Sequence, residues 1–249
     1  MANVITGIEN KFKESGTSVS GTREIQSEEV EINGIWYRII DTVGIGDTKL
    51  KKEEVLDKIA EAVYLAKDGI SQVFFVISKK FDQSEMGNFN LLKAIVFDQE
   101  VVNHTTIVRT RFEKFKDLEK CQEDIDSMVG GGNKLSEIIK SCQKRVIYVD
   151  NPSLNLVSDK NEDKAGKKER EAKIENRKET RGKSREVLLE HLEKVCHKGP
   201  YQPSKLQKLS DEISVYMEQK IKKKEELEEK EKTRKALEKL EREAKKKEK

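Results

Sequence analysis

Residues 39–47 read IIDTVGIGD, an apolar strand that runs directly into an Asp-x-x-Gly sequence. In nucleotide-binding α/β domains, an Asp at the end of a strand holds Mg²⁺, usually through water, and a Gly three residues later offers its backbone N–H to the last phosphate. Asp41 and Gly44 have the spacing for these two roles. The alternative is a strand-ending Asp that caps a turn, because Asp-x-x-Gly is common by chance.

The sequence before this stretch predicts a β-hairpin. Apolar and charged residues alternate over Glu29–Ile32, Asn33-Gly34 suits a type I′ turn, and Ile35–Ile40 forms a more buried second strand. Upstream lies the polar loop SVSGTREIQ, in which Thr22 could place its hydroxyl on Mg²⁺, as the first-switch threonine of GTPases does. The alternative for Thr22 is a solvated loop threonine.

Helices and short apolar strands alternate over the rest of the first 157 residues. Helices are expected over about 52–66 and 84–96 and between 115 and 141, and buried strands at QVFFVIS, TTIVRT and RVIYVDNP. A hairpin followed by this alternation is typical of an α/β three-layer domain with a mostly parallel sheet. Ligands of such sheets bind at the carboxyl ends of the strands.

The remainder of the chain is highly charged. Residues 158–185 contain almost no apolar residue, so a disordered or loosely helical insert is expected there, and 186–198 restore an amphipathic helix that packs back on the sheet. Residues 199–249 are rich in Lys and Glu and predict a long exposed helix. Three interpretations of this tail stay open: a solvated helix, which is the default, one strand of a coiled coil with a partner, and a weak contact with a membrane surface.

Composition limits the class of protein. The 249 residues carry 50 Lys and Arg against 47 Asp and Glu, with the two signs interleaved, which gives no strong attraction to nucleic acid. The longest apolar runs are too short to span a bilayer, the first residues lack a signal-peptide pattern, and the three cysteines lack metal or disulfide spacing. A soluble, cytoplasmic protein without nucleic-acid or membrane partners is expected.

Several stretches fall in the order and spacing of one protein family. These are ANVITG, KFKES, SVSGTREIQ, IIDTVGIGDT, VFFVIS, TTIVRTRFEKF, RVIYVDNP and SREVLLEHL. Together they resemble the avirulence-induced-gene type (AIG type) of G domain, the GTPase class that also contains the immunity-associated GIMAP proteins. The resemblance covers about residues 2–196. It implies a P-loop GTPase fold, GTP and GDP as ligands with Mg²⁺, and association of two copies through the G domain.

The resemblance also assigns residues. Asp41 and Gly44 match the Mg²⁺ and γ-phosphate loop, and Thr22 matches the first switch. The base-specificity loop matches RTRFE and the position just beyond the last strand, which gives the candidates Arg109, Thr110, Arg111, Glu113 and Asn151. This loop departs from the Asn-Lys-x-Asp of ordinary GTPases, whose Asp accepts hydrogen bonds from guanine, so Glu113 is the candidate substitute.

No catalytic residue is predicted. Many GTPases use a Gln directly after the switch-two Gly to position the attacking water, and Ile45 occupies that place. Hydrolysis is therefore expected to be slow or to need a residue from a partner, for example across a dimer of G domains. His104 is one candidate for such a residue, and a polar strand-edge residue is the plainer interpretation.

One element of the family does not occur in the sequence. Its G-x-x-x-x-G-K-[ST] loop precedes the stretch that resembles ANVITG, and RGKS at 181–184 has neither the earlier Gly nor a strand before it. We therefore expect the first strand and this loop to lie before Met1, as with a truncated reading frame or an alternative start. Nucleotide binding is then expected to be impaired, because that loop supplies most of the phosphate contacts.

Two functions are compatible with these expectations. The first is a Mg²⁺-dependent guanine-nucleotide switch. The second is a GTPase-derived interaction module without nucleotide chemistry, in which the charged helices bind a partner. A purely helical scaffold is disfavoured by the hairpin and the three buried strands.

Overall fold

The computed structural model describes two compact units, Met1–Leu206 and Gln207–Lys249. The described residues are 1–13, 24–42, 44, 52–78, 81–95, 99–156, 163–196, 199–201, 222, 226, 229–231 and 233–235. Those of the second unit are helical and exposed, and the long charged helix predicted for the whole tail stays a prediction. Among the described residues, no helix has both the length and the apolar character needed to cross a membrane.

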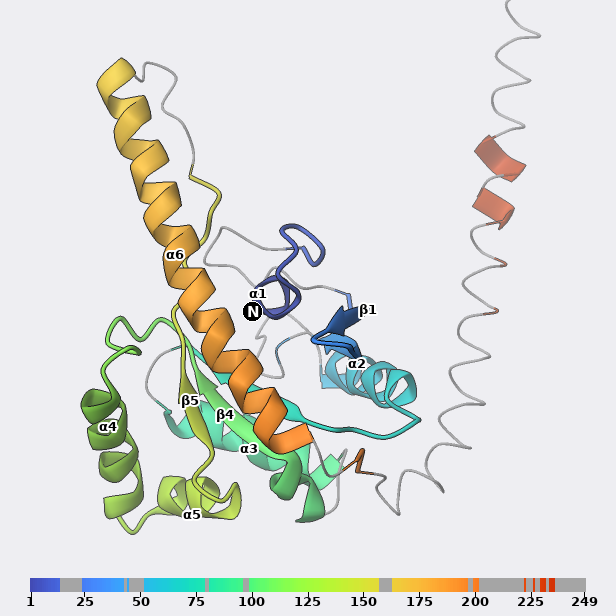
Figure 1. Ribbon diagram of the computed structural model, residues 1–249. Coiled ribbons are helices and arrows are strands. Elements are labelled where there is room, and N and C mark those ends of the chain that lie inside the picture. The colour runs from blue at the N-terminus through green and yellow to red at the C-terminus, as the bar shows by residue number, and fades with distance from the viewer. Residues whose placement is uncertain are drawn as a thin grey trace, which may run out of the picture. The chain divides into compact units, whose positions relative to one another are not determined.

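The first unit begins with a short helix and the hairpin and then alternates between helices and strands (Figure 1). In chain order the elements are α1 (Ala2–Thr6), β1 (Gln26–Ile32), β2 (Ile35–Asp41), α2 (Lys52–Leu65), β3 (Val73–Ile77), α3 (Gln83–Ile95), the 3₁₀ helix η1 (Gln99–His104), β4 (Thr105–Arg109), α4 (Leu118–Gly130), α5 (Lys134–Ser141), β5 (Val146–Tyr148) and α6 (Lys164–Val195). This order confirms the predicted α/β class.

β1 and β2 form the predicted antiparallel hairpin. Its turn residues Asn33 and Gly34 have φ values of 51° and 79°, as a type I′ turn requires, and both residue types tolerate a positive φ. Val30 and Ile32 are buried on one face of β1. The hairpin places Asp41 at the last position of β2, where the chain leaves the sheet.

β3, β4 and β5 form a separate parallel sheet with β4 in the middle (Figure 1). The register pairs Ile77 of β3 with Arg109 of β4, and Arg109 with Tyr148 of β5. The carboxyl ends of the three strands therefore lie at one edge of the sheet. The prediction of a mostly parallel sheet is confirmed for these strands.

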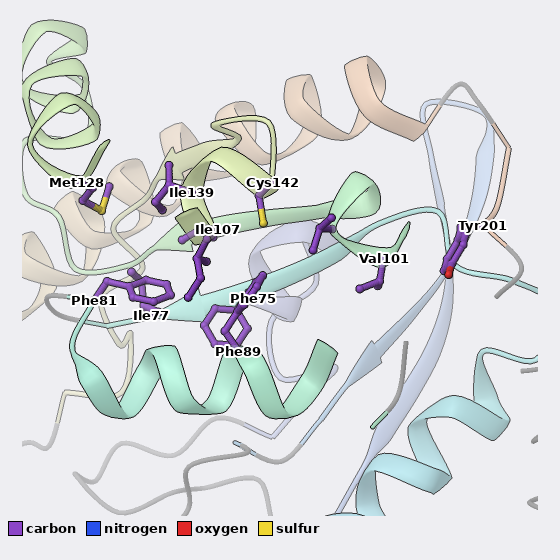
Figure 2. Close-up of a cluster of buried hydrophobic side chains, with 12 residues drawn as sticks. Phe75, Ile77, Phe81, Phe89, Val101, Ile107, Met128, Ile139, Cys142 and Tyr201 are labelled. Carbon is purple, nitrogen blue, oxygen red and sulfur yellow. The ribbon is translucent and has the colours of Figure 1, made fainter. Parts of the chain in front are cut away.

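Helices cover both faces of the parallel sheet, as predicted for a three-layer domain. One face packs on α3, α4 and α5 through a hydrophobic cluster (Figure 2). Within it the Phe75 and Phe89 rings meet edge-on, with their centres 5.2 Å apart. The other face packs on α1 and α6. Adjacent strand residues point to opposite faces, so Ile107 belongs to the first cluster and Val108 to the second, and both are fully buried.

The second cluster joins the two sheets to each other. It contains Val4 and Ile5 of α1, Val30 and Ile32 of β1, Val108, Val149, and Leu188 and Leu192 of α6. The hairpin and the parallel sheet are therefore held by one hydrophobic core beneath α1 and α6, although no strand ladder joins them among the described residues. The last turns of α6 are as much part of this core as the strands.

α6 is one continuous helix of 32 residues, where the sequence predicted an insert over 158–185 and a separate helix over 186–198. The side chain of Asp163 caps its first turn. Glu and Lys are strong helix formers, and i,i+4 pairs such as Glu169 with Lys173 (2.6 Å) add support. A segment without apolar residues cannot form a hydrophobic core by itself. It can still be helical when one end of the helix is anchored in a core, as the last turns of α6 are.

The first unit also continues beyond residue 199, where the tail was predicted to begin. Tyr201 exchanges two backbone hydrogen bonds with Ile70, of 2.7 and 2.8 Å, and its buried ring stacks on the His104 ring at 5.0 Å. The His104 Nδ1 lies 3.3 Å from the carbonyl oxygen of Ser71. His104 thus packs at the amino end of β4, opposite the ligand-binding edge, which favours its plainer interpretation.

Candidate functional site

The candidate site lies at the carboxyl edge of the parallel sheet. The loop after β4 carries Thr110, Arg111 and Glu113, and the segment after β5 carries Asp150 and Asn151. β4 and β5 are adjacent and parallel, so the two loops leave the sheet side by side. This is the edge at which parallel sheets bind their ligands.

Arg109, one of the base-binding candidates, is engaged within the protein. Its guanidinium forms an ion pair with Asp124 of α4 and lies 4.9 Å from the centre of the Phe112 ring. Asp124 also accepts a 2.7 Å hydrogen bond from the hydroxyl of Tyr148. Burial, and then this bond, raise the pKa of Tyr148. We therefore assign Arg109 to fixing α4 against the sheet.

Removing the Tyr148 hydroxyl tests how much its bond to Asp124 stabilises the fold. Tyr148→Phe is expected to lower the free energy of unfolding by about 1 kcal/mol, the usual net contribution of one hydrogen bond, because Asp124 keeps its ion pair with Arg109. Urea unfolding followed by circular dichroism measures the change. An unchanged midpoint would mean that the hydroxyl bond contributes nothing.

Thr110 has a structural role as well, whereas Arg111 and Glu113 are exposed. The Thr110 backbone N–H and hydroxyl both donate to the carbonyl oxygen of Ile77, at 2.8 and 3.1 Å. Arg111 has a φ of 56°, a left-handed conformation that costs a non-glycine residue about 1–2 kcal/mol. Such strain persists where the surroundings fix the loop, and it clusters at binding sites.

Charged side chains gather around Asp150. Its pKa is raised by burial and then by the nearby Glu113, whereas Arg111 and Arg177 of α6 lower it. The structure therefore brings Arg111 and Glu113, from one loop, to the residue directly before Asn151. Sequence reasoning missed Asp150, although it adjoins a candidate, and Arg177, which lies in the segment taken for an insert.

Asn151 has the clearest mark of a ligand site. Its amide Nδ2 and Oδ1 are both buried, and neither has a hydrogen-bond partner among the described residues. Buried polar groups are nearly always paired, and leaving one unpaired costs about 1–3 kcal/mol. The amide presents an amino donor beside a carbonyl acceptor, and the donor can pair with an acceptor such as N7 on the edge of a purine base.

Two of the predicted phosphate-side residues, Asp41 and Gly44, lie at and just beyond the end of β2. Asp41 is partly buried, and burial raises its pKa while the amino group of Met1 lowers it. Within the described residues its carboxyl group makes no hydrogen bond or ion pair, and Gly44 is exposed. Thr22 and Ile45 lie outside the described residues.

A partly buried carboxyl group without a partner among the described residues fits a divalent cation, because a nearby positive charge stabilises the ionised carboxylate. The described residues hold no group of three or more potential His, Cys, Asp or Glu ligands. Mg²⁺ would suit Asp41 nonetheless, since this ion is commonly held by one or two carboxylates together with phosphate oxygens and water.

The raised pKa of Asp41 predicts a pH dependence of stability. The unfolded chain loses this proton first, so the contribution of Asp41 to stability falls as the pH rises past about 3.9, the ordinary pKa of Asp. Asp41→Asn removes that loss, and we expect the variant to become more stable than the wild type as the pH is raised to 7 without divalent cations. Thermal unfolding of both proteins from pH 4 to 7 measures the difference, and a difference that does not change with pH would contradict it.

Comparison with known proteins identifies the family. The family model described as the AIG1 family matches residues 1–170, more than half of the chain. The chain belongs to the AIG1 family. It thus contains an AIG1-type G domain, and the α/β architecture with a parallel sheet fits a P-loop GTPase-like fold.

The relatives of this AIG1 chain include named nucleotide-binding proteins. Immune-associated nucleotide-binding protein 13 of Arabidopsis thaliana is 27% identical over 121 residues, 48% of this chain and 34% of the relative. Immune-associated nucleotide-binding protein 1 of the same plant is 26% identical over 48% of this chain and 53% of its own length. The tRNA modification GTPase MnmE of Acetivibrio thermocellus is 29% identical over 55% of this chain and 30% of the relative. The AIG1 chain thus spans between about a third and a half of these relatives.

Proposed function

We propose that this AIG1 chain is a guanine-nucleotide-binding switch protein that takes GTP and GDP with Mg²⁺. The observation that carries the proposal is the amide of Asn151, which is buried at the carboxyl edge of the sheet without a partner among the described residues. Membership of the AIG1 family and the similarity to proteins named as nucleotide-binding or GTPase support it.

The base would meet Asn151 and Glu113. Guanine offers the acceptors O6 and N7 and an amino donor, whereas adenine offers a donor in place of O6. The Asn151 amide supplies a donor to O6 or N7, and the exposed carboxylate of Glu113 accepts from the guanine donors. Glu113 then has the role that an Asp has in ordinary GTPases.

The phosphate side would supply the switch. Asp41 would hold Mg²⁺, the N–H of Gly44 would meet the γ-phosphate, and the Thr22 hydroxyl would reach Mg²⁺ when that phosphate is present. Bound Mg²⁺ neutralises the charge of the phosphates. The contacts of Gly44 and Thr22 depend on the γ-phosphate, so the GTP and GDP states differ at these two loops.

Affinity is expected to depend on a phosphate loop. The 249 residues contain no G-x-x-x-x-G-K-[ST] sequence. About half a dozen hydrogen bonds to charged phosphates, each contributing about 1.5–3 kcal/mol, are then absent, so we propose that binding by these residues is strongly impaired and that a form that carries the loop binds tightly. Hydrolysis is slow or partner-stimulated in this proposal, because Ile45 cannot orient water.

The proposal extends to partners and location. Two G domains associate with each other, the charged tail joins a coiled-coil partner, and the protein acts in the cytoplasm. A rise of GTP turnover per site with protein concentration would support association of G domains. A constant turnover per site would count against it.

Retention on immobilised GTP tests the function. The 249-residue chain, and the product of the native transcript, are passed over the resin with Mg²⁺ or with EDTA. We expect retention that EDTA abolishes and that is stronger for any product with the phosphate loop. Asp41→Asn is expected to remove retention, whereas the exposed control Asp126→Asn is expected to leave it intact. Retention of neither protein, or retention insensitive to EDTA, would favour the interaction module.

A further inference from the structure

Ser184 of α6 binds the backbone of the residue before Asn151. Its hydroxyl accepts a 3.0 Å hydrogen bond from the Asp150 N–H and donates a 2.7 Å bond to the Asp150 carbonyl oxygen. Ser184 is completely buried. One side chain thus satisfies both backbone polar groups of Asp150 at a point where β5 has ended and no strand ladder does so.

Arg177 holds the other side of the same segment. It lies seven residues before Ser184 and so on nearly the same face of α6, and its Nη1 donates a 2.6 Å hydrogen bond to the Ser153 carbonyl oxygen. α6 also contacts β5 (Figure 1). The segment from Asp150 to Ser153 is therefore fixed at both ends by one rigid helix.

Asn151 lies between these two anchors. A side-chain amide on a free surface loop would turn toward water and satisfy its donor and acceptor there. The Asn151 amide instead stays buried without a partner among the described residues, a costly state that persists only where the surrounding structure imposes it. From α6, the hydroxyl of Ser184 and the guanidinium of Arg177 hold the backbone on the two sides of Asn151.

We propose that Ser184 and Arg177 are positioning residues that hold the Asn151 amide ready for the edge of a purine base. The inference rests on the proposed function for the identity of the ligand. α6 is then a wall of the base site. The four letters RGKS at 181–184, which resemble a phosphate loop, contribute Ser184 to the base side of the site and do not hold a phosphate.

Hydrogen exchange of the Asp150 amide tests the anchor without any nucleotide. In the full 249-residue chain, Ser184→Ala is expected to accelerate this exchange by about tenfold or more, because the N–H loses its acceptor. The control Lys183→Ala, at the exposed neighbouring position, is expected to leave it unchanged. Unchanged exchange in the Ser184 variant would overturn the anchor.

Binding of GMP and AMP, followed by saturation-transfer NMR, tests the positioning role. We expect the wild type to bind GMP more tightly than AMP. Ser184→Ala and Arg177→Ala are each expected to lower the GMP affinity about tenfold. Arg177→Lys is expected to recover part of this affinity, because Lys can donate to the Ser153 carbonyl oxygen. The Arg177 variants keep the core of α6 and so test the role even if Ser184→Ala folds poorly. GMP binding by both alanine variants at wild-type affinity would overturn the positioning role alone, and no GMP binding by the wild type would overturn the proposed function together with it.

Discussion

Replacing Leu188 by Ala is expected to lower the free energy of unfolding by about 3 kcal/mol, which is typical of a large-to-small change at a fully buried position. Leu188 is completely buried in the cluster that joins α1, the hairpin and the parallel sheet. Truncating it opens a cavity that elements on three sides would have to fill. Such a loss is a large part of the stability of an ordinary domain.

The matched control is the same substitution at Leu118. This side chain is 81% exposed in the first turn of α4, so Leu118→Ala is expected to change the stability by no more than about 0.5 kcal/mol. Urea unfolding of both variants measures the contrast. Equal losses in the two variants would show that the last turns of α6 do not belong to the core.

Replacing Asn151 by Leu is expected to change stability and binding in opposite directions. Leu has a similar volume but no polar atoms, so the substitution removes two buried unpaired groups and is expected to raise the free energy of unfolding by about 1–2 kcal/mol. Affinity for guanine nucleotide is expected to fall by about tenfold or more, because Leu cannot donate to O6 or N7 and leaving such a group unpaired costs about 1–3 kcal/mol. Gains of stability at the expense of binding are characteristic of functional sites.

Asn155→Leu is the control for this prediction, since Asn155 lies four residues further along and is exposed. We expect it to alter neither thermal stability nor binding. Differential scanning fluorimetry without ligand gives the first quantity and titration with GDP gives the second. A loss of stability in Asn151→Leu would mean that the amide already has a partner within the folded protein.

The features that are encoded locally could be predicted from the sequence. The turn at Asn33-Gly34 follows from two adjacent residues that tolerate positive φ, and the strands of the parallel sheet follow from short apolar runs. Asp41 at the end of β2 follows from the apolar residues that precede it. Each of these signals is contained in fewer than ten residues.

The features that depend on distant contacts could not be predicted. That Arg109 pairs with Asp124 of α4, and so holds the fold together, is a matter of tertiary packing. The continuity of α6 was missed because a low apolar content was taken to indicate a disordered or loosely helical insert, although an anchored helix needs only one end in the core. The hydroxyl of Ser184 reaches Asp150 across 34 residues of sequence, and no local pattern predicts that contact.

The most direct test of guanine-nucleotide recognition is an NMR titration of the 249-residue chain with GTP, GDP or ADP in the presence of Mg²⁺. The signals to follow are the side-chain amide of Asn151 and the backbone amide of Gly44. NMR detects weak binding, so the test does not require a phosphate loop. We predict that GTP and GDP shift the Asn151 signal, that ADP leaves it in place, and that GTP alone shifts Gly44. An Asn151 signal that stays unchanged with GTP and GDP, or moves equally with ADP, would contradict guanine recognition at this edge of the sheet.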